Sequence, residues 1–184
     1  MSKIVSINQP YFFPNIGFIK MISLSDMHIA LDDVNMRKKS WITRNKFASD
    51  DDMYSLKVKD ISQNRYIHEH YLIDPLSQIK EFKEYFYQIN RKDAFIELIM
   101  DMLNLDLLLN HEKLNIADFN VGCLRLILSI LNIKTGIILS SSLSKKRQNS
   151  CFIRYYFMSF IQMYSLYSNH NPHFPTLHQV PLFW

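Results

Sequence analysis

Two adjacent aspartates, Asp32 and Asp33, are candidate functional residues because of their carboxylates and their position in the sequence. They follow the apolar run M-H-I-A-L at 27–31, where a buried strand would end. A carboxylate there can act as a general base, contact a substrate amine or bind a metal ion. It can equally cap a strand-end turn. Since successive side chains of a strand point to opposite faces, only one aspartate can enter a site unless the chain turns there.

A proline-rich turn after the first apolar run is a second candidate. Gln9 follows the run K-I-V-S-I-N at 3–8, and Gly17 lies at the start of a predicted helix. The amides of a helix N-terminus attract phosphate or carboxylate, and a glycine lets a ligand or a neighbouring backbone approach closely. The alternative is a stiff turn that buries the three aromatics at 11–13.

Nucleotidyltransferases carry an H-x-G-H motif in the first turn between strand and helix. Residues 15–18 read N-I-G-F here, so the glycine is in place and both histidines are missing. Those histidines stabilise the transferring phosphate, so their absence disfavours nucleotidyl transfer even if the fold is related.

A third candidate is the stretch R-K-K-S-W-I-T-R-N-K-F at 37–47, which mixes five basic residues with two aromatics. Such a stretch can bind RNA or a phosphorylated small molecule, or it can be a solvated strand. Strict alternation would place Trp41, Thr43 and Asn45 on one face and Ile42, Arg44 and Lys46 on the other. Because no RNA-binding signature accompanies the stretch, we expect no nucleic-acid partner.

The histidines form no recognisable site in the sequence. His68 and His70 lie two residues apart in a polar stretch, a pattern more typical of the surface than of a ligand pair. No phosphate-binding loop and no nucleophile-elbow motif occurs. The sequence therefore shows no metal signature and leaves the cofactor unknown.

The elements that must position these candidates follow an α/β pattern. Strand-like runs at 3–8 and 27–32 flank a helical run at 15–25, which predicts a βαβ unit. Runs at 41–47 and 53–58 predict an antiparallel hairpin. Helices are predicted from Asp74-Pro75 to about 90, at 93–109 and at 115–131, and a further strand at 133–139. We therefore predict an α/β fold with a parallel-sheet βαβ core, a nucleotidyltransferase-like start, an antiparallel hairpin and a helical second half.

The C-terminal segment differs in composition from the rest. Residues 151–184 hold ten aromatics and a single charged residue, Arg154, without clean periodicity. We expect a single α/β domain over 1–150 and an atypical aromatic-rich tail over 151–184.

Charge is distributed unevenly along the chain. Residues 1–118 hold 15 basic and 17 acidic residues, whereas residues 119–184 hold six basic residues and no acid, so the net +4 does not describe a uniformly basic surface. Two cysteines suit a reduced compartment, and neither a signal peptide nor a membrane span is recognisable. We therefore predict a cytoplasmic protein; the oligomeric state stays open.

Several pieces of the sequence, in this order and spacing, resemble the WbqC-like family of bacterial proteins. The specific ones are Q-P-Y-F-F-P-N-I-G-F at 9–18, L-D-D-V-N at 31–35, R-K-K-S-W at 37–41 and R-N at 44–45. Further similarity lies in L-N-I-A-D-F-N at 114–120, I-L-N-I-K-T at 130–135 and S-S-S-L at 140–143. The resemblance covers roughly residues 3–147.

The resemblance implies O-antigen, lipopolysaccharide or other surface-polysaccharide biosynthesis. It implies transfer of a glycyl or other acyl group from an acyl donor to an amino sugar or sugar nucleotide. The implied pocket consists of Gln9, Tyr11, Gly17, Asp33, Arg37, Trp41, Arg44 and Asn45, with Asp32 as a further binding candidate. Our hypothesis is that Asp33 takes a proton from the attacking amine, Arg44 or Arg37 holds a phosphate or carboxylate, and Gln9 and Asn45 orient the acceptor.

The sequence departs from the family pattern after R-Q-N at 147–149, where a Gly-rich G-G-x-x-L-Y segment is expected. A reading-frame change near codon 150 would explain the departure, and a diverged tail is the alternative. Two other functions stay open: a non-catalytic sugar-nucleotide binding protein of the same pathway, and an inactive, truncated family member. A nucleic-acid binder ranks last.

Overall fold

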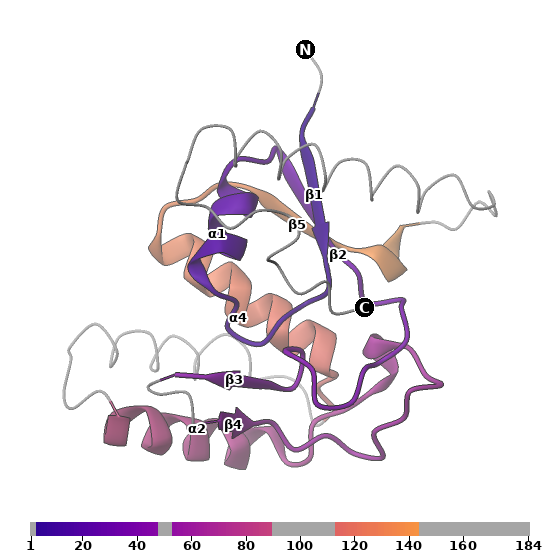
Figure 1. Cartoon of the computed structure of the whole chain (residues 1–184), viewed down its shortest axis with the longest axis vertical. Coiled ribbons are helices and arrows are strands. Elements are labelled where there is room, and N and C mark those ends of the chain that lie inside the picture. The colour runs from indigo at the N-terminus through magenta and orange to yellow at the C-terminus, as the bar shows by residue number, and fades with distance from the viewer. Residues whose placement is uncertain (1–2, 48–52, 90–112, 144–184) are drawn as a thin grey trace, which may run out of the picture. The chain divides into compact units, whose positions relative to one another are not determined.

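Two sheets and three α-helices make up the part of the chain that the computed structural model describes, residues 3–47, 53–89 and 113–143 (Figure 1). These residues all lie in one unit, Met1–Leu143. The elements are β1 Val5–Asn8, α1 Ile16–Ser23, β2 Met27–Ala30, β3 Arg44–Lys46, β4 Met53–Ser55, α2 Pro75–Ile89, α4 Ile116–Ile130 and β5 Gly136–Leu139, with 3-10 turns at Ile67–Glu69 and Ser140–Ser142. The helix predicted at 93–109 and the tail lie outside the described residues.

The larger sheet is parallel, in the order β1-β2-β5. Asn8 lies opposite Ala30, and Ala30 lies opposite Leu139, so the three strands end at the same level. With α1 between β1 and β2, this arrangement confirms the predicted βαβ core, and β5 adds its third strand. The mixed α/β class is confirmed, with the separate β3-β4 pair antiparallel as predicted.

Helix α1 begins at a side-chain cap, and this cap explains one of the few glycines. The Asn15 Oδ1 atom accepts a hydrogen bond from the Phe18 N–H at 3.0 Å. A Cβ atom added at Gly17 would lie 3.3 Å from that same oxygen, closer than most such contacts. Gly17 therefore leaves room for the capping side chain. Its φ is not positive, so no left-handed conformation requires the glycine.

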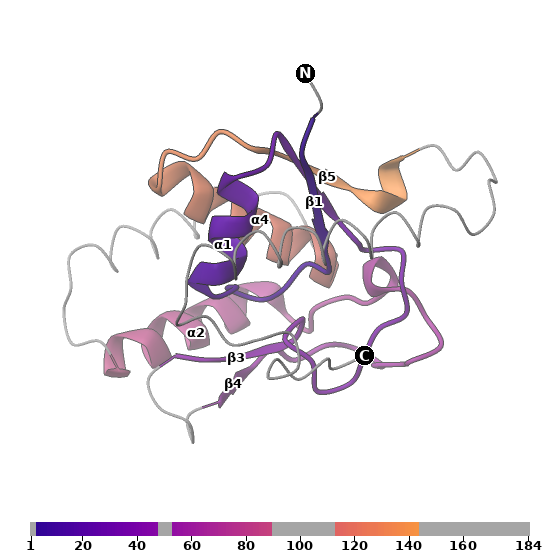
Figure 2. The same ribbon diagram turned by 45° about the horizontal axis from the view of Figure 1, so that its top comes forward.

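Helices α1 and α4 lie side by side on one face of the parallel sheet (Figures 1 and 2). Their apolar faces meet in a buried cluster of Phe18, Ile19, Ile22, Leu124 and Leu128. α4 also begins as predicted, because Asn115 accepts a hydrogen bond from the Asp118 N–H at 2.8 Å. The apolar residues of these helices thus bury one face of the sheet and hold its strands in register.

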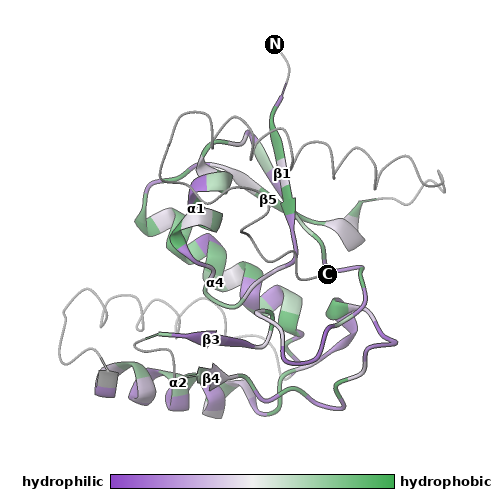
Figure 3. Ribbon diagram, viewed as in Figure 1, coloured by the Kyte–Doolittle hydropathy of each residue, from purple (hydrophilic) through white to green (hydrophobic). Residues whose placement is uncertain are grey.

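A second apolar cluster surrounds Phe12 and joins α4 to the β3-β4 hairpin and α2. α2 starts after Asp74, whose carboxylate accepts from the Ser77 N–H at 3.2 Å, as the Asp-Pro pair predicted. Strand β3 is hydrophilic along its whole length (Figure 3). The apolar contacts of the hairpin therefore come from residues such as Phe47, which follows β3, and Tyr54 of β4.

A buried amide links the opening turn to the hairpin segment. Asn120 of α4 is fully buried, and its Nδ2 atom donates to the Pro10 and Ile42 carbonyls, each at 2.8 Å. A second link runs from the Phe12 N–H to the Trp41 carbonyl at 2.8 Å. These bonds fix the turn after β1 against the segment before β3.

The predicted alternation over 41–46 is wrong at its start. Ile42 and Thr43 are neighbours and both are buried, while Trp41 is exposed. The reason is a turn: the Thr43 N–H donates to the Ser40 carbonyl at 3.1 Å, and the strand begins only at Arg44.

Candidate functional site

The carboxyl ends of the three parallel strands bring together residues that are far apart in the sequence. Gln9 follows β1, Asp32 and Asp33 follow β2, and Ser140 follows β5. Because the strands end in register, these side chains share one edge of the sheet, the edge at which open α/β sheets bind their ligands.

Asp32 is the buried centre of this edge, with 1% of its surface exposed. Its Oδ1 atom accepts from the Ser140 hydroxyl at 2.9 Å and from the Ser141 N–H at 2.8 Å. Its Oδ2 atom accepts from the Ser141 hydroxyl. Three donors from one segment satisfy the oxygens of this buried carboxylate and fix its orientation.

Asp33 meets the same serine. The Ser140 hydroxyl also lies within hydrogen-bond reach of the Asp33 carboxylate. A hydroxyl carries one hydrogen and can serve only one acceptor at a time, so the two carboxylates share this donor. Both can reach it because β2 ends at Ala30 and the chain bends at Asp33 and Val34, so strand alternation does not separate them.

His68 joins the cluster from a segment that sequence analysis placed at the surface. Its Nδ1 atom lies 2.9 Å from the Asp32 carbonyl oxygen and 3.7 Å from the Asp32 carboxylate. The pairing of Met36 and Val34 with Arg65 and Ile67 brings this segment alongside the residues that follow β2. His68 is half-buried, with its side chain 32% exposed.

The surface prediction is wrong for His70, which is fully buried. Its Nδ1 atom donates to the Tyr66 carbonyl at 2.8 Å, and its Nε2 atom accepts from the Ser62 N–H at 3.1 Å. Both ring nitrogens are therefore used to hold the loop that carries His68. The polar sequence around His70 does not predict its burial, because its hydrogen-bond partners are backbone groups.

Tyr11 and Arg37 lie near one another on the opening turn and the segment before the hairpin. Burial raises the pKa of the Tyr11 hydroxyl, and the positive charge of Arg37 acts in the opposite direction. The Tyr11 ring also packs against Phe18, with ring centroids 5.6 Å apart. A neutral phenol beside an exposed guanidinium can contact a polar, anionic ligand.

The Asn45 amide already has partners within the protein. Its Nδ2 atom donates to the Phe12 carbonyl at 2.9 Å and to the Phe13 carbonyl, and its Oδ1 atom accepts from the Lys46 N–H at 2.8 Å. These bonds hold the hairpin against the opening turn. To orient an acceptor, the Asn45 amide would have to break these hydrogen bonds.

The remaining candidates lie on the surface or close to it. Trp41 is 47% exposed, Arg44 is half-buried on β3, and Gly17 is exposed at the start of α1. The structure therefore gathers Gln9, Asp32 and Asp33 at the sheet edge, and gathers Tyr11, Arg37, Trp41 and Asn45 around the opening turn.

Sequence reasoning missed His68, Ser140 and Ser141. One signal was available for the serines: they directly follow the predicted strand at 133–139. Had that strand been predicted parallel to the one at 27–32, its carboxyl end would have placed these serines beside the aspartates. No comparable signal marked His68.

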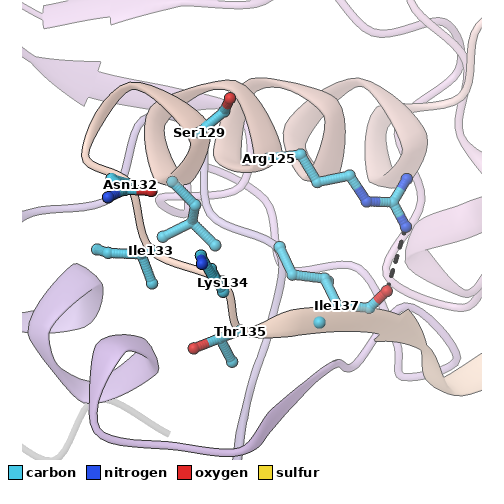
Figure 4. A pocket seen from close by; sticks show the side chains of 9 residues that line it. Arg125, Ser129, Asn132, Ile133, Lys134, Thr135 and Ile137 are labelled. Carbon is cyan, nitrogen blue, oxygen red and sulfur yellow. Dashed lines mark hydrogen bonds between the residues drawn. The ribbon is translucent and has the colours of Figure 1, made fainter.

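A hollow of about 360 Å³ lies at the other end of β5 (Figure 4). It is lined by residues from the end of α4 and the start of β5, among them Arg125, Lys134 and Thr135. Arg125 donates to the Ile137 carbonyl at 3.2 Å, drawn as the dashed line. None of the predicted site residues lines this hollow.

The described residues contain neither a metal-binding group of side chains nor a membrane-spanning helix. In residues 3–47, 53–89 and 113–143, no three histidine, cysteine or acidic side chains are grouped in a way that could hold a metal ion. Within the same ranges, no helix combines the length and the apolar character that crossing a membrane requires.

Comparison with known proteins identifies the family. Residues 9–165 match the WbqC-like protein family, so the match covers most of the chain and includes all nine candidate residues. It also extends beyond residue 147, where the resemblance of the quoted motifs was expected to end. No curated protein and no solved structure matches the chain. The chain belongs to the WbqC-like protein family.

Proposed function

We propose that this protein transfers a glycyl or other small acyl group to the amino group of a sugar or sugar nucleotide. The transfer would serve O-antigen or other surface-polysaccharide biosynthesis in the bacterial cytoplasm. The observation that carries the proposal is the cluster of Asp32, Asp33, Ser140 and Ser141 at the carboxyl edge of the parallel sheet. Family membership supports it.

The chemistry of acyl transfer explains why such a cluster is useful. An amine that attacks an acyl carbonyl must lose a proton, and a carboxylate or imidazole at the site can accept it. The carbonyl oxygen gains negative charge, which hydrogen-bond donors such as the serine hydroxyls or the Gln9 amide can stabilise. All of these groups lie at or next to the strand ends.

The basic and aromatic residues around the opening turn suit the non-reacting part of the substrate. Arg37 is exposed, and Arg44 lies on the hydrophilic strand β3. A guanidinium binds phosphate or carboxylate through two hydrogen bonds, and the half-exposed Trp41 ring can stack on a sugar or base. A nucleotide sugar contains a phosphate, a sugar and a base, which are the groups that these residues can bind.

The direct test is turnover by the full chain. Purified protein is incubated with nucleotide amino sugars and activated acyl donors, and products are detected by mass spectrometry. We expect one acyl addition per acceptor, and we expect Asp33→Asn to lower the rate by about tenfold, the effect of losing one charge-assisted hydrogen bond at the site. Asp60→Asn is the matched control, since Asp60 is exposed and its described contact is made by its backbone carbonyl.

The outcomes separate the proposed function from its alternatives. Tight binding of nucleotide sugar without any product would indicate a non-catalytic binding protein. Equal rates for Asp33→Asn, Asp60→Asn and the unmodified protein would remove Asp33 from the chemistry.

A further inference from the structure

The tautomer of His68 follows from its hydrogen bonds. The Asp32 carbonyl oxygen lies 2.9 Å from His68 Nδ1 and 3.1 Å from the His68 backbone N–H. A carbonyl oxygen can only accept, so Nδ1 must carry the hydrogen. The neutral ring then has an unprotonated Nε2 atom, which is the form a base requires.

The Asp32 carboxylate lies near the same ring nitrogen of His68. Its Oδ2 atom lies 3.7 Å from His68 Nδ1, and the carboxylate is almost completely buried. Its orientation is fixed by the Ser140 and Ser141 donors. Asp32 therefore approaches the ring at Nδ1 with both its carbonyl oxygen and its carboxylate. Asp32 holds the imidazole of His68 in place, and the unprotonated Nε2 atom can then act as a base.

The exposed fractions of Asp32 and His68 suit a buried supporting carboxylate and an accessible base. Asp32 is 1% exposed, whereas the His68 side chain is 32% exposed. The carboxylate is therefore inaccessible to a substrate, and the imidazole can be reached. The Tyr66 ring lies beside the imidazole, with centroids 5.8 Å apart, and helps to fix its plane.

We propose that His68, rather than Asp33, is the general base of this site, and that Asp32 is its positioning residue. The inference rests on the proposed acyl transfer. The acceptor amine attacks the carbonyl carbon of an acyl ester or thioester, and a carbon–nitrogen bond forms. His68 Nε2 takes the proton from that nitrogen. As the bond from carbon to the leaving oxygen or sulfur breaks, the imidazolium returns the proton to the leaving group.

The first test compares three variants of the full chain in the turnover assay. We expect His68→Gln to lower kcat by about 100-fold or more with little change in KM, because the base acts on the chemical step. We expect Asp33→Asn to lower kcat much less than His68→Gln does, and added imidazole to restore activity to His68→Ala. A rate for His68→Gln within about threefold of the unmodified protein would overturn the assignment.

The second test does not depend on turnover. Nitrogen-15 NMR of the histidine side chains reports which ring nitrogen of His68 carries the hydrogen, and we expect Nδ1. An Nε2–H tautomer overturns the base assignment whatever the activity is. An Nδ1–H tautomer in a chain that transfers no acyl group to any acceptor overturns the proposed function instead.

Discussion

Replacing Phe12 by alanine should lower the free energy of unfolding by about 3–5 kcal/mol. Phe12 is 1% exposed, and its ring meets five other aromatic rings. The closest are Phe13 and Phe82, with centroids 5.1 and 5.3 Å away. Removing the ring leaves a cavity among residues of the opening turn, the hairpin, α2 and α4. Chemical denaturation monitored by circular dichroism measures the loss.

The matched control is Ile16→Ala, four residues away along the chain. Ile16 is 79% exposed, so its truncation should change stability by less than about 0.5 kcal/mol. A Phe12→Ala protein that lost no more stability than this control would show that the aromatic cluster does not hold these elements together.

Stability should fall by about 3 kcal/mol as the pH is lowered from 6.5 to 4, because of one buried histidine. His28 of β2 is fully buried, and its Nδ1 atom lies 2.9 Å from the Ser6 hydroxyl. Burial lowers the pKa of His28 from 6.5 to about 4, while a hydrogen bond with Ser6 acts in the opposite direction. In this pH range the unfolded chain binds a proton that the native protein does not bind. Acid therefore favours unfolding, and the stability is fully present above pH 6.5.

The variant His28→Phe separates this effect from other titrating groups. Phenylalanine has a similar shape and no proton to bind, so unfolding of the variant should depend less on pH between 6.5 and 4. The measured quantity is the difference between the two proteins in free energy of unfolding at each pH. If the two curves stay parallel, His28 does not control the acid sensitivity.

Local patterns were sufficient to predict much of the fold. The β1-α1-β2 unit and the starts of α1 and α2 all depend on residues close together in the sequence, such as Asn15 and Asp74. Alternation failed at Ile42 and Thr43, because bonds to Ser40 and to the distant Asn120 fix a turn there. Such long-range bonds leave no periodic signal in a single sequence.

The candidate site was predicted less completely for the same reason. The aspartates and Gln9 stood out because each follows a strand-like run. Ser140 and His68 contact Asp32 across 108 and 36 residues. The predicted strand before Ser140 was the one local signal, and no local signal marked His68. Asn45 looked like a ligand contact, yet the backbone of the opening turn uses its amide.

The division into a domain over 1–150 and a tail over 151–184 stays a prediction, and so does a change of reading frame near codon 150. The described residues end at Leu143. The family match nevertheless runs to residue 165 and so includes the first part of the aromatic-rich segment.

The most direct test of the account is to map where a nucleotide amino sugar binds. Amide NMR spectra of the full chain are recorded while the ligand is added. The account predicts that the largest shift changes occur at the sheet edge, at Gln9, Asp33, His68 and Ser141. Changes confined to the hollow at 132–137, with the sheet edge unaffected, would contradict it.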